Sequence, residues 1–226
     1  MKIGIITQAR MSSKRLPGKV LKKIGGKTLL EYHVGRALNS GFPVIVATST
    51  DKGDDQIETI CKEKKWHCFR GDLSDVLSRY YHAAKKYELD VIIRITSDCP
   101  LIDSTLIKRG VTLFRKTHVQ YISNTVKRTY PAGFDFELFT FTALESAYMQ
   151  ATKKYEREHV TPYIWQHPNL FSIKQLTQKH DYSQYRLTVD EIDDFSLVRK
   201  LIEEFGVVDQ NYRTITKIMR ENSELA

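Results

Sequence analysis

Gln8-Ala9-Arg10-Met11-Ser12-Ser13-Lys14-Arg15-Leu16-Pro17-Gly18-Lys19 is the stretch that indicates the fold, and the rest of the chain can be interpreted outward from it. It directly follows an apolar run at residues 2–7, which is short enough to be a buried first strand. Four cations lie in this stretch beside two serines, a proline and a glycine. Backbone N–H groups, hydroxyls and positive side chains together suit an anion with many oxygens. The stretch therefore predicts a triphosphate-binding loop, although a basic loop after a strand is often only solvated surface.

The rest of the sequence alternates between strand and helix signals. Apolar runs predict strands at residues 43–48, 66–69 and 91–95, and helical spacing predicts the segments between them, beginning with a helix that Thr28 caps. This order favours parallel strands joined by right-handed crossovers. Beyond residue 119 period-two stretches predict further strands at 121–124, 130–139, 171–173 and 185–190. The expected fold is α/β: a three-layer sandwich with a mainly parallel, doubly wound sheet and a small antiparallel extension.

Length, charge and cysteine content limit the classes of protein to which the chain can belong. The chain has 226 residues, a net charge of +8 and only three cysteines, without a Cys-x-x-Cys pair. We therefore expect one domain over residues 1–226, without a disulfide framework or a zinc site. No signal peptide or membrane-spanning run is found, which predicts a cytoplasmic protein with no membrane partner. The positive charge is compatible with nucleic acid, but its scatter along the chain favours solubility and an anionic small substrate instead.

Two acidic residues follow predicted strands and are candidate metal ligands. Asp98 comes directly after the most continuous apolar run, and Pro100 stiffens the turn that follows. From this residue alone, a metal ligand and a helix N-cap are about equally supported. Asp103 is the better cap for the next helix, which leaves Asp98 available. Asp190 follows the last predicted strand, whereas Asp193 or Asp194 would cap the helix after it.

Several of these motifs, in this order, resemble the sugar cytidylyltransferases, and most closely the spore-coat polysaccharide synthesis F type. The matching segments cover nearly the whole chain: 8–19, 70–77, 98–101, 130–137, 158–162 and 186–194. The family has the fold of the nucleotide-diphospho-sugar transferases. Its implied reaction is transfer of a cytidylyl group from CTP to an acidic keto-acid sugar, with release of pyrophosphate, for surface polysaccharide synthesis.

The resemblance also implies roles for individual residues. It places nucleotide contacts at Ala9, Arg10, Ser13, Arg15 and Lys19, and contacts to the base at Arg70 and Gly71. It assigns Mg²⁺ to Asp98 and Asp190, which would act in catalysis with Arg10 and Lys19. It also makes Gly133, Glu158 and His159 candidate contacts to the acceptor sugar. Without the resemblance, a histidine in the position of His159 is more often a helix-surface or capping residue.

Two other functions are compatible with parts of this sequence. A nucleotide-sugar-dependent glycosyltransferase would share strand-end aspartates and a metal, but it does not need a basic loop for a third phosphate. A nucleic-acid-binding protein would use the +8 charge and bind with a steep salt dependence.

Residues 119–168 are expected to form a sugar-binding and dimerisation excursion, because they carry many aromatic side chains. The chain is therefore predicted to be a homodimer.

Overall fold

Four apolar runs from the first half of the chain form a parallel sheet in the computed structural model, which describes residues 1–225. At its centre β1 (Ile3–Gln8) pairs with β4 (Val44–Ser49) on one side and β6 (Val91–Thr96) on the other, and β5 (His67–Gly71) pairs with β4. Gln8 and Thr96 are partners in the ladder. The loops after β1 and β6 therefore leave the sheet side by side, at the edge where open α/β sheets bind ligands.

Three shorter strands from the second half extend this sheet. β8 (Glu137–Thr140) runs antiparallel to β6, β7 (Tyr121–Ser123) runs antiparallel to β8, and β9 (Ile173–Gln175) runs parallel to β7. The strand order is β5-β4-β1-β6-β8-β7-β9, and a separate antiparallel hairpin is formed by β2 (Lys23–Ile24) and β3 (Lys27–Thr28). The expected mainly parallel α/β sheet with a mixed portion after residue 120 is confirmed.

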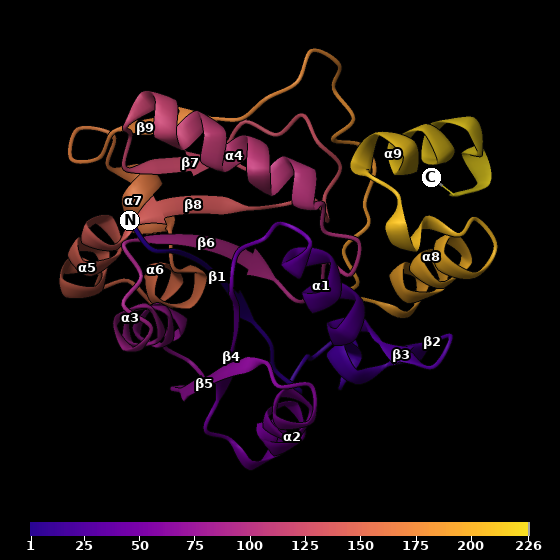
Figure 1. Cartoon of the computed structure of the whole chain (residues 1–226), viewed down its shortest axis with the longest axis horizontal. Helices are drawn as coiled ribbons and strands as arrows, with labels where there is room; N and C mark the ends of the chain where they lie inside the picture. Colours follow the sequence, from indigo (N-terminus) through magenta and orange to yellow (C-terminus); the bar gives the residue numbers. More distant parts are fainter. Residues whose placement is uncertain (226) are drawn as a thin grey trace.

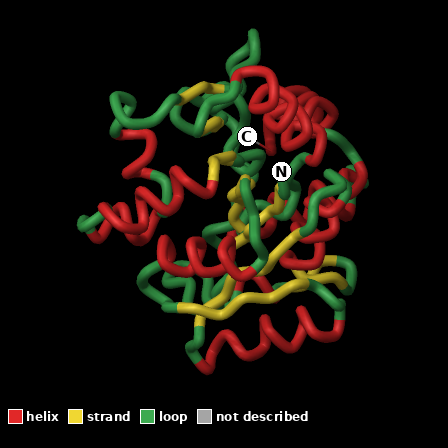
Figure 2. The backbone as a smooth tube through the Cα atoms, turned by 60° about the vertical axis from the view of Figure 1, so that its left-hand side comes forward, coloured by secondary structure: helices red, strands yellow, loops and turns green. Residues whose placement is uncertain are grey.

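Helices cover both faces of the sheet and give the molecule three layers (Figures 1 and 2). One hydrophobic core lies under α1 (Leu29–Leu38), α2 (Asp55–Glu63), α4 (Ser104–Thr117), α8 (Ile192–Glu203) and α9 (Tyr212–Glu221). A second core on the opposite face lies under α3 (Val76–Lys86), α5 (Phe141–Gln150), α6 (Lys154–His159) and α7 (Pro162–Gln166). Short 3₁₀ turns are found at Lys19–Leu21, Lys52–Asp54, Val207–Asp209 and Ser223–Leu225. Within residues 1–225, no helix is long and apolar enough to span a bilayer.

Two predicted helix caps are present. Thr28 accepts from the Glu31 N–H, and the Glu31 carboxylate accepts from the Thr28 N–H, which forms a capping box at the start of α1. Asp103 accepts from two N–H groups in the first turn of α4. Because Asp103 caps this helix, Asp98 is not required for that purpose.

The structure corrects two predicted strands. Of residues 130–139 only the end joins a strand, β8, and residues 185–190 form no strand at all. These two segments meet at a single isolated bridge between Ala132 and Arg186. The first segment turns at Gly133, whose φ is +107°, so the pairing cannot continue into a ladder. Asp190 therefore lies on an irregular segment, which the Val189 N–H anchors by donating to the Asp98 carbonyl at 2.8 Å.

Candidate active site

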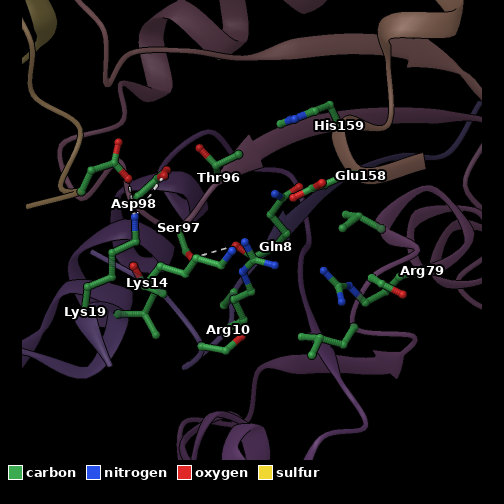
Figure 3. A pocket seen from close by; sticks show the side chains of 18 of the residues that line it. Gln8, Arg10, Lys14, Lys19, Arg79, Thr96, Ser97, Asp98, Glu158 and His159 are labelled. Atoms are coloured by element: carbon green, nitrogen blue, oxygen red, sulfur yellow. Dashed lines mark hydrogen bonds and ion pairs between the residues drawn. The ribbon is translucent and has the colours of Figure 1, made fainter. Parts of the chain in front are cut away.

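A cavity of about 640 Å³ lies at the carboxyl ends of β1 and β6 (Figure 3). The loop after β1 supplies one side, and residues Thr96, Ser97 and Asp98 after β6 supply another. The beginning of α3, both ends of the short helix α6, and Asp190 complete the lining. Segments from five parts of the sequence therefore converge on one space, which has the size of a ligand-binding site.

The loop after β1 has a defined conformation that backbone hydrogen bonds stabilise. The Met11 N–H donates to the Asp54 carboxylate at 2.7 Å, and the Gly18 N–H donates to the Met11 carbonyl at 2.9 Å. Gly18 has a φ of +67°, in the left-handed region that favours glycine. This turn directs the chain back toward the sheet. All five residues assigned to triphosphate binding line the cavity: Ala9, Arg10, Ser13, Arg15 and Lys19.

Lys19 joins the two candidate metal ligands. Its Nζ lies 2.8 Å from Asp190 Oδ1 and 3.4 Å from Asp98 Oδ2, and it donates to the Val189 carbonyl at 2.8 Å. The Lys19 side chain is only 12% exposed, so this is not a solvated surface contact. Two carboxylates that are distant in the sequence therefore lie within reach of one ammonium group.

Asp190 is surrounded by positive charge. Besides Lys19, Arg15 lies 3.0 Å and Arg186 3.1 Å from its Oδ2 atom. Burial alone would raise the pKa of the Asp190 carboxyl, but the hydrogen bond and charge of Lys19, with the charges of Arg15 and Arg186, lower the pKa overall. The carboxylate is consequently ionised at neutral pH, as a metal ligand must be. Arg186 also pairs with Asp194 at 2.9 Å and is a further charged residue of the site that was not predicted individually from the sequence.

The chemistry of these donors suits a hard divalent cation. Among residues 1–225 there is no group of three or more His, Cys, Asp or Glu side chains that could hold a metal. Mg²⁺ commonly takes one or two protein carboxylates and completes its shell with water and substrate phosphate. Zinc sites, in contrast, need more nitrogen or sulfur ligands. Asp98 and Asp190 therefore fit Mg²⁺ at a site that phosphate oxygens would complete.

Arg79 lies at the end of the cavity away from Lys19 and is not among the site residues predicted from the sequence (Figure 3). Its side chain is 2% exposed and donates to the Asp72 carbonyl at 2.7 Å. Its Nε has no hydrogen-bond partner among the described residues. Burial lowers the pKa of this guanidinium. The available signal in the sequence was an arginine among the apolar residues of α3, shortly after a strand end.

Glu158 and His159 line the same cavity from the end of α6 (Figure 3). Lys154 lines it from the first turn of this helix. Burial lowers the pKa of His159 and outweighs the raising effect of the Glu158 charge, so the imidazole is neutral at pH 7. The two residues predicted to contact the acceptor therefore lie beside the loop predicted to bind phosphates.

Arg70 and Gly71 are not among the residues that line the cavity. The Arg70 guanidinium donates to the carbonyls of Ser49 at 2.8 Å and Asp51 at 2.9 Å, and it pairs with Glu58 at 3.1 Å. Gly71 ends β5, where its carbonyl accepts from the backbone of residue 50. Both stand at the expected strand end, but their contact with a base stays a prediction.

Gly133 also lies outside the cavity, in contact with the backbone that leads to Asp190. A Cβ placed on Gly133 would come within 2.8 Å of the Leu187 carbonyl carbon. This is closer than real Cβ contacts, so only glycine lets the two segments approach this far. The geometry gives Gly133 a packing role, and a sugar contact at this position stays a prediction.

Comparisons with known proteins agree on one family. A family model described as "Cytidylyltransferase" matches residues 3–218. The spore coat polysaccharide biosynthesis protein SpsF of Bacillus subtilis is 33% identical over 90% of this chain and 88% of its own length. A 3-deoxy-manno-octulosonate cytidylyltransferase of Pectobacterium carotovorum is 33% identical, but only over 48% of this chain and 44% of its own. A solved cytidylyltransferase of Leptospira borgpetersenii aligns with a TM-score of 0.95 and 36% identity, over 100% of this chain and 96% of that one.

Proposed function

The chain belongs to the cytidylyltransferase family, and we propose that it transfers a cytidylyl group from CTP to a sugar hydroxyl, with release of pyrophosphate. One observation carries the proposal. The Lys19 ammonium group bonds Asp190 and contacts Asp98 in a cavity whose loop also supplies Arg10, Ser13 and Arg15. Cations for the phosphates and carboxylates for a metal ion thus lie together, as attack on an α-phosphate requires.

The proposed roles follow from these positions. Arg10, Arg15 and Lys19 would bind the triphosphate and stabilise the negative charge that develops on the leaving pyrophosphate. Asp98 and Asp190 would hold Mg²⁺. When bound there, the ion supplies Lewis-acid charge at the phosphate oxygens and lowers the pKa of the attacking hydroxyl.

The acceptor is proposed from its chemistry and from the relatives. Glu158 and His159 would contact it, because they line the cavity next to the phosphate-binding loop. An acidic keto-acid sugar is favoured by the partial similarity to a 3-deoxy-manno-octulosonate cytidylyltransferase. Use of the product in surface polysaccharide synthesis rests on the name of the Bacillus relative. No observation specifically favours a glycosyltransferase, and the cytoplasmic location stays a prediction.

The experiment that tests this function is a pyrophosphate-release assay. Each of the four nucleoside triphosphates is supplied with Mg²⁺ and a panel of keto-acid sugars. We expect release with CTP and one or more acceptors. Lys19→Ala should weaken CTP binding by roughly 10–100-fold, the equivalent of ~1.5–3 kcal/mol for one charge-assisted contact.

Lys23→Ala is the matched control, because Lys23 is exposed in β2 and lies outside the cavity. Its CTP affinity should equal that of the wild type. Equal CTP affinity in the Lys19 variant, or release from another triphosphate in preference to CTP, would contradict the proposal.

A further inference from the structure

A second cavity, of about 370 Å³, begins where the first one ends. Thr96 and His159, both labelled in Figure 3, line both cavities, so the two spaces adjoin near the carboxyl end of β6. The second cavity continues past β8 toward α7, away from the phosphate-binding loop. In the proposed reaction, an acceptor bound beside the α-phosphate would place the part of the molecule remote from its reacting hydroxyl here.

One ion pair in this second cavity is largely buried. Arg94 pairs with Glu137, a side chain that is only 6% exposed. The Glu137 carboxylate also accepts hydrogen bonds from the hydroxyls of Tyr121 and Thr161. Since the acid is held by three donors, the charges of the pair are compensated within the protein. The Arg94 Nε, in contrast, has no hydrogen-bond partner among the described residues, so it can still donate to a neutral oxygen of a ligand.

A second ion pair is more open to the cavity. Arg128 donates from two nitrogens to the two carboxylate oxygens of Asp135, at 2.6 and 2.9 Å. The side chains are 30% and 23% exposed, so a ligand can reach them. This bidentate geometry is the one that an Arg would otherwise offer to a carboxylate or phosphate of a ligand. Asp135 therefore occupies the position that an anionic ligand group would need.

The remaining lining is uncharged and amphipathic. Hydroxyls are supplied by Thr96, Thr125 and Thr161, and aromatic rings by Tyr155 and Trp165. Burial lowers the pKa of His159, the only other ionisable nitrogen base in the lining, so its ring is neutral at pH 7. Among the described residues, every arginine that lines this cavity has a carboxylate partner in the protein.

We propose, on the basis of the proposed function, that this cavity receives an uncharged, polyhydroxylated remainder of the acceptor sugar. The Arg128–Asp135 pair is then a specificity determinant that rejects acceptors with a second anionic group in that remainder. Such a group would be desolvated beside the Asp135 and Glu137 carboxylates without an unpaired cation to compensate it. Hydroxyl groups, in contrast, can bond the threonines and the outer N–H groups of Arg128, and a sugar face can pack on the aromatic rings.

The wild-type test compares two acceptors that differ in one charged group. 3-Deoxy-manno-octulosonate carries its carboxylate next to the reacting carbon, and its 8-phosphate adds an anion at the remote end. With CTP and Mg²⁺, pyrophosphate release should be at least about 10-fold more efficient, in kcat/KM, for the unphosphorylated sugar, because an uncompensated buried charge is costly. Equal efficiency, or a preference for the phosphate, would overturn the proposal.

Variants then test the pair itself. Asp135→Asn leaves Arg128 with an unpaired positive charge, so the ratio of the two efficiencies should shift toward the 8-phosphate by roughly 10-fold. Arg128→Gln combined with Asp135→Asn removes both charges and should abolish that shift. Asp181→Asn is the control, since this exposed carboxylate lines neither cavity, and its ratio should equal that of the wild type. An unchanged ratio in the Asp135→Asn protein would contradict the assignment.

CTP binding, measured by calorimetry without acceptor, separates failure of this inference from failure of the proposed function. If CTP binds but neither sugar releases pyrophosphate, the acceptor class proposed for the second cavity is wrong while the nucleotide site stands. If CTP does not bind, the proposed function itself is wrong.

Discussion

At the scale of single residues, the ion pairs of Lys19 with Asp98 and Asp190 underlie our prediction that these two acids act in the reaction. Neither aspartate caps a helix, because Asp103 caps α4 and Glu191 precedes α8. Asp98→Asn and Asp190→Asn should therefore fold normally. Each should lose turnover by about 100-fold or more, the scale expected when a group that stabilises transition-state charge is removed.

Urea unfolding and pyrophosphate release, measured side by side, test these two variants. Asp193→Asn is a suitable control, since Asp193 is an exposed acid in the first turn of α8. Near-normal turnover in either variant would show that its negative charge is not needed.

His33 provides a pH-dependent prediction at the same scale. Its ring is fully buried, with Nε2 bonded to the Thr7 hydroxyl and Nδ1 to the Cys99 carbonyl, each at 2.8 Å. Burial lowers the pKa of His33 to about 4, from an ordinary value near 6.5. The unfolded chain therefore takes up this proton first as the pH falls. The free energy of unfolding should decrease by about 3 kcal/mol between roughly pH 6.5 and pH 4 on account of this group.

Denaturant unfolding across that pH range can isolate the contribution of His33. The difference between the wild type and His33→Gln should shrink as the pH falls, because the variant has no such group to protonate. His180→Gln, which alters an exposed histidine, should follow the wild type at every pH. A pH-independent difference between wild type and His33→Gln would refute the prediction.

At the scale of elements, the sequence predicted the parts of the fold whose signal is local. β1, β4 and β6 are continuous apolar runs, and α1 and α4 carry their caps in the sequence. Residues 185–190 alternate like a strand but pair at only one position, because the partner segment turns at Gly133. Pairing depends on a remote segment, so the pattern of one segment cannot establish it.

The same distinction between local and remote signals determines which residues of the candidate site could be predicted from the sequence. The basic loop and Asp98 follow apolar strands directly, so their place at the sheet edge could be inferred from the sequence. Arg79 was missed because its neighbours Val76, Tyr80 and Ala83 are buried core residues, and its own burial was invisible in the pattern. The pairing of Arg128 with Asp135 depends on a loop conformation that no periodicity describes.

Gly133 carries the prediction that belongs to this scale. Gly133→Ala should destabilise the protein by about 1–3 kcal/mol, because alanine is strained at a φ of +107° and its Cβ would collide with Leu187. It should also lower turnover, since the displaced segment leads to Asp190. Gly26→Ala is the matched control: its φ is +84°, but nothing lies within 4 Å of its added Cβ.

Thermal or urea unfolding of both glycine variants separates crowding from backbone strain. We expect the Gly26 variant to be the more stable of the two and to keep its activity. If the Gly133 variant matched it in both measurements, the close approach to Leu187 would have no energetic importance.

At the scale of the whole molecule, the structure buries several of the aromatic side chains from which a homodimer was predicted. The expectation relied on aromatic side chains in residues 119–168, but Tyr121, Tyr130, Phe134 and Tyr163 are buried within the single chain. The large apolar side chains that stay exposed there include Met149 at 71% and Tyr155 at 51%. A dimer that uses this region would therefore have to cover side chains of this kind.

Light scattering at increasing protein concentration tests the prediction of a homodimer through residues 119–168. We expect a mass of two chains for the wild type, and one chain for Met149→Glu with Tyr155→Glu, because the charges would be buried at the interface. Ile192→Glu, at a residue 56% exposed on α8 and outside that region, should not change the mass. A single-chain mass for the wild type at high concentration would contradict the prediction of a homodimer.

The contact of Lys19 with two carboxylates has a consequence for handling and regulation of the protein. Because the ammonium group already neutralises acids that would otherwise repel each other, we expect the structure around Asp98 and Asp190 not to depend on a bound ion. Dialysis against a chelator should therefore leave the melting temperature unchanged while turnover disappears, and added Mg²⁺ should restore turnover at once without a refolding delay. If the proposed function holds, the protein would therefore keep its fold in a magnesium-poor solution and lose only its turnover.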